Sequence, residues 1–147
     1  MKKVMALPKL MFDKNFLDKN LNEFTNTAFI SILDPDNTEN NFSGFNNLLQ
    51  VRMWDLEETV TNDNGKVYEV PSVDVLTQIV EFVNENSDKN FVIHCSAGVS
   101  RSGAVARFIW EKFYTEIDKW EFLRVNNRIQ PNLYIYNKLV DIDLMYN

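Results

Sequence analysis

Short apolar runs alternate along this chain with amphipathic stretches, and this order strongly constrains the fold. The runs at 28–33, 48–54 and 91–94 have the length of buried strands, and turn-forming residues bound them. Residues 3–7 predict a further short edge strand. Apolar residues recur at helical spacing in five other segments. These predicted helices cover 13–24 (with Asp13 as a possible cap), 71–83, 101–114, the surroundings of 120–123, and a last helix from 131.

Strands that alternate with helices predict an α/β fold. We expect a three-layer sandwich, with a central, mainly parallel sheet of four to five strands and helices on both faces. Such sheets bind ligands at the carboxyl ends of their strands. The 147 residues contain no repeat and no Gly/Ser linker, so we expect a single domain over 1–147.

Composition excludes several functional classes. The formal net charge of −6 disfavours nucleic acid as a partner. No apolar run approaches the roughly 20 residues of a membrane span, so no membrane partner is expected. The single cysteine excludes a disulfide within the chain, and we expect a monomer in a reducing compartment, the cytoplasm. One Cys and one His also make a zinc site improbable, so neither metal nor cofactor is expected.

The turn after the run at 91–94 carries the strongest chemical signal, because residues 94–103 read HCSAGVSRSG. Small residues let the backbone curl, so that successive N–H groups form an anion-binding nest at the start of a helix. The Arg101 guanidinium adds donors matched to two phosphate oxygens. The residues expected to bind a phosphate group are Ser96, Ala97, Gly98, Val99, Ser100 and Arg101.

Cys95 lies at the mouth of this turn, where a helix N-terminus and an arginine favour the thiolate. The hydroxyl of Ser102 can donate to the sulfur and stabilise the thiolate. His94 precedes the cysteine and would point to the opposite face of a strand, so we expect it to support the loop. A lone cysteine is more often a small buried hydrophobe; the joint spacing of these residues favours a phosphate site.

The pattern His94-Cys95-x-x-Gly98-x-x-Arg101-Ser102 resembles the signature of the protein tyrosine phosphatase superfamily at all five defined positions. Arg128-x-x-Pro131-Asn132, followed by Leu139, is similar to the C-terminal helices of the compact dual-specificity phosphatases. The resemblance covers roughly 30–143 and omits the loop 57–70. It implies a phosphotyrosine protein phosphatase-like fold and a metal-free displacement, in which Cys95 is the nucleophile and Arg101 binds the phosphate and the transition state.

The resemblance also implies a general acid from a separate loop. Asp55 is favoured, because it directly follows the predicted strand 48–54. Asp63 is the alternative, since its separation from Cys95 is closer to that usual in the family, and Glu57 or Glu58 are weaker candidates. The loop that holds these acids is long enough to act as a lid.

The implied function is hydrolysis of phosphate monoesters through a phosphocysteine intermediate. Phosphorylated protein is the expected substrate, with phosphotyrosine as the leading class and phosphoserine/threonine as a further one. The turn contains no Lys, which disfavours phosphoinositides. Two other readings stay open: an inactive phosphatase-like module that binds phosphoproteins, and a rhodanese-like sulfurtransferase.

Overall fold

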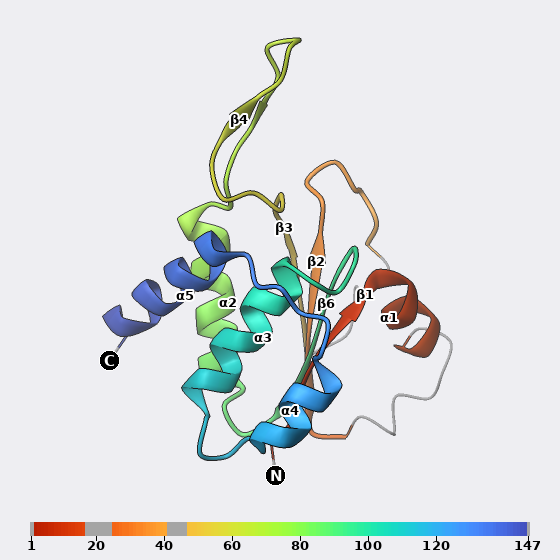
Figure 1. The fold of residues 1–147 in the computed structure, drawn as a ribbon, viewed down its shortest axis with the longest axis vertical. Helices are drawn as coiled ribbons and strands as arrows, with labels where there is room; N and C mark the ends of the chain where they lie inside the picture. The colour runs from red at the N-terminus through yellow and green to blue at the C-terminus, as the bar shows by residue number, and fades with distance from the viewer. Residues whose placement is uncertain (1, 17–24, 41–46, 147) are drawn as a thin grey trace.

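A sheet of four parallel strands forms the centre of the protein (Figure 1). The computed structural model describes residues 2–16, 25–40 and 47–146. The strands of this sheet are β1 (Val4–Pro8), β2 (Thr27–Leu33), β3 (Leu48–Arg52) and β6 (Asn90–Cys95). Their order across the sheet is β1-β6-β2-β3, and every neighbouring pair is parallel. The predicted α/β class with a parallel sheet is therefore confirmed, and the first strand lies at an edge as expected.

Helices cover both faces of this sheet. Figure 1 shows α1 on one face and the remaining helices on the other. The helices are α1 (Lys9–Phe16), α2 (Val73–Glu85), α3 (Arg101–Lys112), α4 (Lys119–Val125) and α5 (Leu133–Met145). The Ser72 side chain caps α2 by accepting from the Val75 amide at 3.2 Å, as expected for a helix opened by Pro71-Ser72.

Alternation along β6 divides its side chains between two apolar clusters. Phe91, Ile93 and Cys95 lie in the large core shared with α2, α3 and α5. Val92 lies in the smaller cluster on the opposite face, with Phe12 of α1. Because successive residues of a strand point to opposite faces, this register aims the cysteine towards α3 and its predecessor, His94, away from it.

The N-terminal helix starts four residues earlier than predicted. It begins at Lys9, directly after β1, and Asp13 lies inside it rather than capping it. Asp13 pairs with Lys9 one turn earlier, so its carboxylate supports the helix from within. The apolar positions 17–24 on which the prediction depended lie outside the described residues, as does part of the expected loop 36–47.

The segment expected as an irregular acidic loop contains a hairpin. Its strands are β4 (Val60–Thr61) and β5 (Val67–Tyr68), which pair antiparallel. Gly65 has φ +79° in the connecting turn, a conformation that glycine adopts without strain. Figure 1 shows the hairpin projecting beyond the carboxyl ends of the sheet strands. Within the described ranges, no helix has both the length and the apolar character needed to cross a bilayer.

Candidate active site

The turn between β6 and α3 lies at the carboxyl edge of the sheet and is packed against the end of β1. Gly98 has φ +72°, and a Cβ there would lie 2.4 Å from the backbone nitrogen of Pro8. The Lys9 amide donates to the Ser96 carbonyl at 3.2 Å. Only glycine fits this approach, so the backbone of β1 holds the curl of the turn in place.

The sulfur of Cys95 lies at the base of this turn. Its residue is 2% exposed, and Sγ is 3.1 Å from Oγ of Ser102, which is fully buried. Burial raises the pKa of the Cys95 thiol. Hydrogen bonds from Ser102 and from the Gly98 amide, together with the charge of Arg101, outweigh burial and leave that pKa below its ordinary value. The turn thus favours a thiolate in a nearly dry position.

Arg101 is only 5% exposed, and its guanidinium is held on two sides. Nη1 donates to Asp34 Oδ1 and to the Met53 carbonyl, both at 2.7 Å. Nη2 donates to Ser96 Oγ at 3.0 Å. Nε is buried without a hydrogen-bond partner among the described residues. Because a buried N–H group is costly unless it is paired, this donor suits an anion held by the turn.

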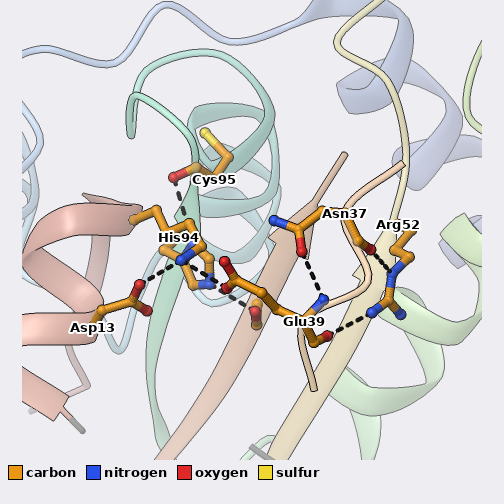
Figure 2. A network of polar contacts seen from close by, with 8 residues as sticks. Asp13, Asn37, Glu39, Arg52, His94 and Cys95 are labelled. Atoms are coloured by element: carbon orange, nitrogen blue, oxygen red, sulfur yellow. Dashed lines mark hydrogen bonds and ion pairs between the residues drawn. The ribbon is translucent and has the colours of Figure 1, made fainter. Parts of the chain in front are cut away.

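His94 lies behind the turn, on the other side of the strand from the sulfur (Figure 2). Its Nε2 is 2.6 Å from Ser31 Oγ on β2, and its ring packs on Phe12 with centroids 4.3 Å apart. Burial lowers the pKa of His94 to about 4, so the ring is neutral at pH 7. Its contacts fit the expected support of the loop.

A polar network flanks His94 and joins three segments (Figure 2). Lys9 pairs with Asp13 in α1 and with Glu39 after β2. The carbonyls of Asn37 and Glu39 accept from Arg52 at 2.8 and 2.7 Å. These bonds join the segment after β2 to Arg52 of β3 and to Lys9 of α1. The Lys9 amide is the group that donates to Ser96.

The structure brings Asp55 to the turn between β6 and α3. Its Oδ1 accepts hydrogen bonds from Ser100 Oγ at 2.8 Å and from Asn132 Nδ2 at 2.9 Å. Asp63 lies instead in the exposed hairpin turn after β4. Glu57 accepts from the Leu133 amide at the start of α5, at 3.1 Å, and Glu58 is exposed. Among the four acids weighed from the sequence, only Asp55 has a hydrogen bond to the turn within the described residues.

Two residues of this site were not predicted from the sequence. Asp34 follows β2 and binds Arg101, and Asn132 caps α5 while binding Asp55. Asp34 could have been found, because β2 was predicted and acidic side chains at the carboxyl ends of parallel strands meet at one edge. Asn132 was noted only as part of a family resemblance. Within the described residues, no group of three His, Cys, Asp or Glu side chains could hold a metal ion.

The sequence of this chain matches the model of a known family. The sequence model of the protein-tyrosine phosphatase family, "Protein-tyrosine phosphatase", matches residues 20–123. No curated protein sequence matches the chain.

Several solved structures share the fold over nearly the whole chain. Human DUSP28 is 11% identical with a TM-score of 0.54, covering 97% of this chain and 92% of its own. PTPMT1, solved in complex with PI(5)P, is 17% identical with a TM-score of 0.52, covering 99% and 95%. OH1 from the Orf virus, described as a tyrosine phosphatase with triple substrate specificity, is 14% identical with a TM-score of 0.52, covering 99% and 84%. At these identities the likeness is one of fold.

Proposed function

The chain belongs to the protein-tyrosine phosphatase family, and on this premise we propose that it hydrolyses phosphorylated proteins through a phosphocysteine intermediate. The observation that carries the proposal is the juxtaposition at one turn of a thiol with a lowered pKa, a buried arginine with an unpaired donor, and a carboxylate. Phosphotyrosine is the leading substrate, with phosphoserine and phosphothreonine as further candidates.

In the first step the Cys95 thiolate attacks phosphorus in line, forming an S–P bond as the P–O bond to the leaving group breaks. Nε and Nη2 of Arg101 and the amides of residues 96–101 stabilise the charge on the equatorial oxygens. Asp55 donates its proton to the departing oxygen. This role is supported by its hydrogen bond to Ser100, which keeps the carboxyl group at the rim of the turn.

In the second step a water molecule attacks the phosphocysteine. Asp55, now a carboxylate, accepts a proton from this water, the S–P bond breaks, and inorganic phosphate leaves. The sulfur departs as a thiolate, which the hydroxyl of Ser102 stabilises across the 3.1 Å contact. The cysteine returns to its starting state, so the cycle needs no redox partner.

Steady-state hydrolysis of a chromogenic aryl phosphate and of a phosphotyrosyl peptide tests this function. Cys95→Ser should lower kcat by at least about 10⁴-fold, as expected when a nucleophile is removed, while inorganic phosphate still binds. Acid quench of the wild-type protein with ³²P-labelled substrate should trap one label on Cys95.

Other outcomes of this experiment point to different activities. Phosphopeptide binding without turnover by the wild-type protein would identify a binding module. Cysteine-dependent sulfur transfer from thiosulfate, with no phosphate release, would identify a sulfurtransferase. Either result contradicts the proposed function.

A further inference from the structure

A hollow of about 360 Å³ lies beside the phosphate-binding turn, between the end of β3 and the β4–β5 hairpin. We call it the hairpin hollow. Its lining residues are Asp34, Trp54, Asp55, Leu56, Val60 and Tyr68. Four of the six are apolar or aromatic, and the two carboxylates are the ones that bind the turn.

The hollow is continuous with the turn through those two carboxylates. Asp34 binds Nη1 of Arg101 at 2.7 Å, and Asp55 accepts from Ser100 at 2.8 Å. Each of these side chains therefore contacts the turn and also lines the hollow. A group that extends from a phosphate held in the turn, on the side of Asp55, enters the hollow.

The proposed mechanism places the leaving group on that side. An in-line displacement requires the departing oxygen to lie opposite the attacking sulfur, and the acid must reach this oxygen within hydrogen-bond distance. Asp55 is the proposed acid. The carbon skeleton attached to the departing oxygen is thus directed into the hairpin hollow.

The walls of the hollow favour a flat apolar group. Trp54 and Tyr68 meet edge to face, with ring centroids 5.2 Å apart and planes at 72°, an arrangement that accepts a further ring on an open face or edge. Val60 is the cross-strand partner of Tyr68 and lies on the same side of the hairpin. Among the described residues, the lining contains no Lys or Arg that could pair with additional phosphates on a leaving group.

The hairpin is held in shape by its own bonds. Asn62 accepts from the amides of Asn64 and Lys66 through its side chain, at 3.0 and 2.9 Å, and its own amide donates to the Lys66 carbonyl at 2.9 Å. The Lys66 ammonium lies over the Tyr68 ring, 4.9 Å from its centroid. These bonds fix the register of the hairpin, so that Val60 and Tyr68 both line the hollow that also contains Asp55.

We propose that the β4–β5 hairpin is the specificity element of this enzyme, and that the hairpin hollow binds the aromatic ring of phosphotyrosine in preference to an alkyl phosphate ester or a polyphosphorylated headgroup. This inference rests on the proposed function, because the direction of the leaving group follows from the role of Asp55. It assigns the discrimination to Trp54, Val60 and Tyr68.

The experiment compares two peptides of one sequence that carry either phosphotyrosine or phosphoserine. Tyr68→Ala should lower kcat/KM for the phosphotyrosyl peptide about ten-fold, as expected for loss of an aromatic contact, and change the phosphoserine value less than about two-fold. Val60→Ala should act in the same direction with a smaller effect. Val67→Ala is the matched control, since Val67 lies in the same hairpin, is 52% exposed, and does not line the hollow.

Two further measurements separate the possible failures. Inhibition by inorganic phosphate should be unchanged in all three variants, because the turn itself is untouched. Peptide binding to the Cys95→Ser protein, with and without Tyr68→Ala, reports on the hollow independently of turnover.

Equal effects of Tyr68→Ala on both peptides, or equal effects of Val60→Ala and Val67→Ala, would overturn the inference while leaving the phosphatase activity standing. If the protein binds the phosphotyrosyl peptide more tightly than the phosphoseryl peptide but hydrolyses neither, the proposed activity is overturned, while the hairpin hollow stands as a binding site for the aromatic ring.

Discussion

The turn proposed to bind phosphate and the β4–β5 hairpin both follow strands of the central sheet, yet they are held by different means. Cys95, Gly98 and Arg101 of the turn are buried, and the backbone of β1, the start of α3 and the side chain of Ser102 contact it. The hairpin projects from the body and is bonded mainly within itself (Figure 1). The proposed nucleophile is therefore fixed by dense packing. Recognition of the substrate is assigned to a segment that can vary without disturbing the core.

The largest effect is expected at Arg101, which is proposed to bind phosphate. Arg101→Lys should lower kcat/KM by about 10³-fold, because a single ammonium replaces a fork whose three nitrogens are separately placed. Circular dichroism should show an intact fold. An unchanged kcat/KM would contradict the role of the guanidinium.

The two aspartates considered as acid divide between the two regions, so their variants test the comparison directly. Asp55→Asn should lower kcat by about 10²- to 10³-fold on an aryl phosphate whose leaving group is a poor one, and by less when the leaving group is already acidic. Asp63→Asn, in the hairpin turn, should leave kcat unchanged. The reverse pattern would move the acid to the hairpin and make it part of the reactive centre.

Two glycines with positive φ give a matched pair for stability. Gly98→Ala combines left-handed strain with a Cβ 2.4 Å from the Pro8 nitrogen, so we expect a loss of about 2–5 kcal/mol in the free energy of unfolding. Gly65→Ala meets no atom within 4 Å and should cost only the strain, about 1–2 kcal/mol. Urea denaturation measures both. Similar losses would mean that the turn is no more tightly packed than the hairpin.

A further effect is expected in the pH dependence of stability. Burial lowers the pKa of His94 from 6.5 to about 4. Between pH 6.5 and pH 4, the His94 ring is therefore protonated in the unfolded chain and neutral in the folded protein. Stability should therefore fall as the pH drops from 6.5 towards 4, by up to roughly 3 kcal/mol from this residue. Denaturation of the wild type and of His94→Asn over this range isolates the effect. Parallel curves would exclude it.

The sequence predicted the tightly packed region far better than the exposed one. Residues 91–102 combine the apolar run of a buried strand, a run of small residues and a helix start, and each of these has a local physical signature. The contacts of Asp34 with Arg101 and of Asn132 with Asp55 depend on segments 67 and 77 residues apart in the chain, which no local pattern encodes. The hairpin was read as a loop, because two-residue strands such as Val60–Thr61 are too short to show an alternating pattern.

The position of α1 shows the same limit in another form. A helical spacing of apolar residues indicated that a helix was present, but its start at Lys9 is set by the end of β1. Ion pairs with Lys9 hold Asp13 and Glu39, residues far apart in the chain. The residue at which such a helix starts is set by its packing against other elements, so it cannot be predicted from the sequence of the helix alone.

The central claim is that the turn ionises one sulfur, and thiol alkylation measures this directly. The chain has a single cysteine, so the rate of reaction with iodoacetamide reports on Cys95 alone. We predict a pH profile whose midpoint lies below the ordinary thiol value of about 8.5, with protection by added inorganic phosphate. A midpoint at or above that value, with no effect of phosphate, would contradict the account.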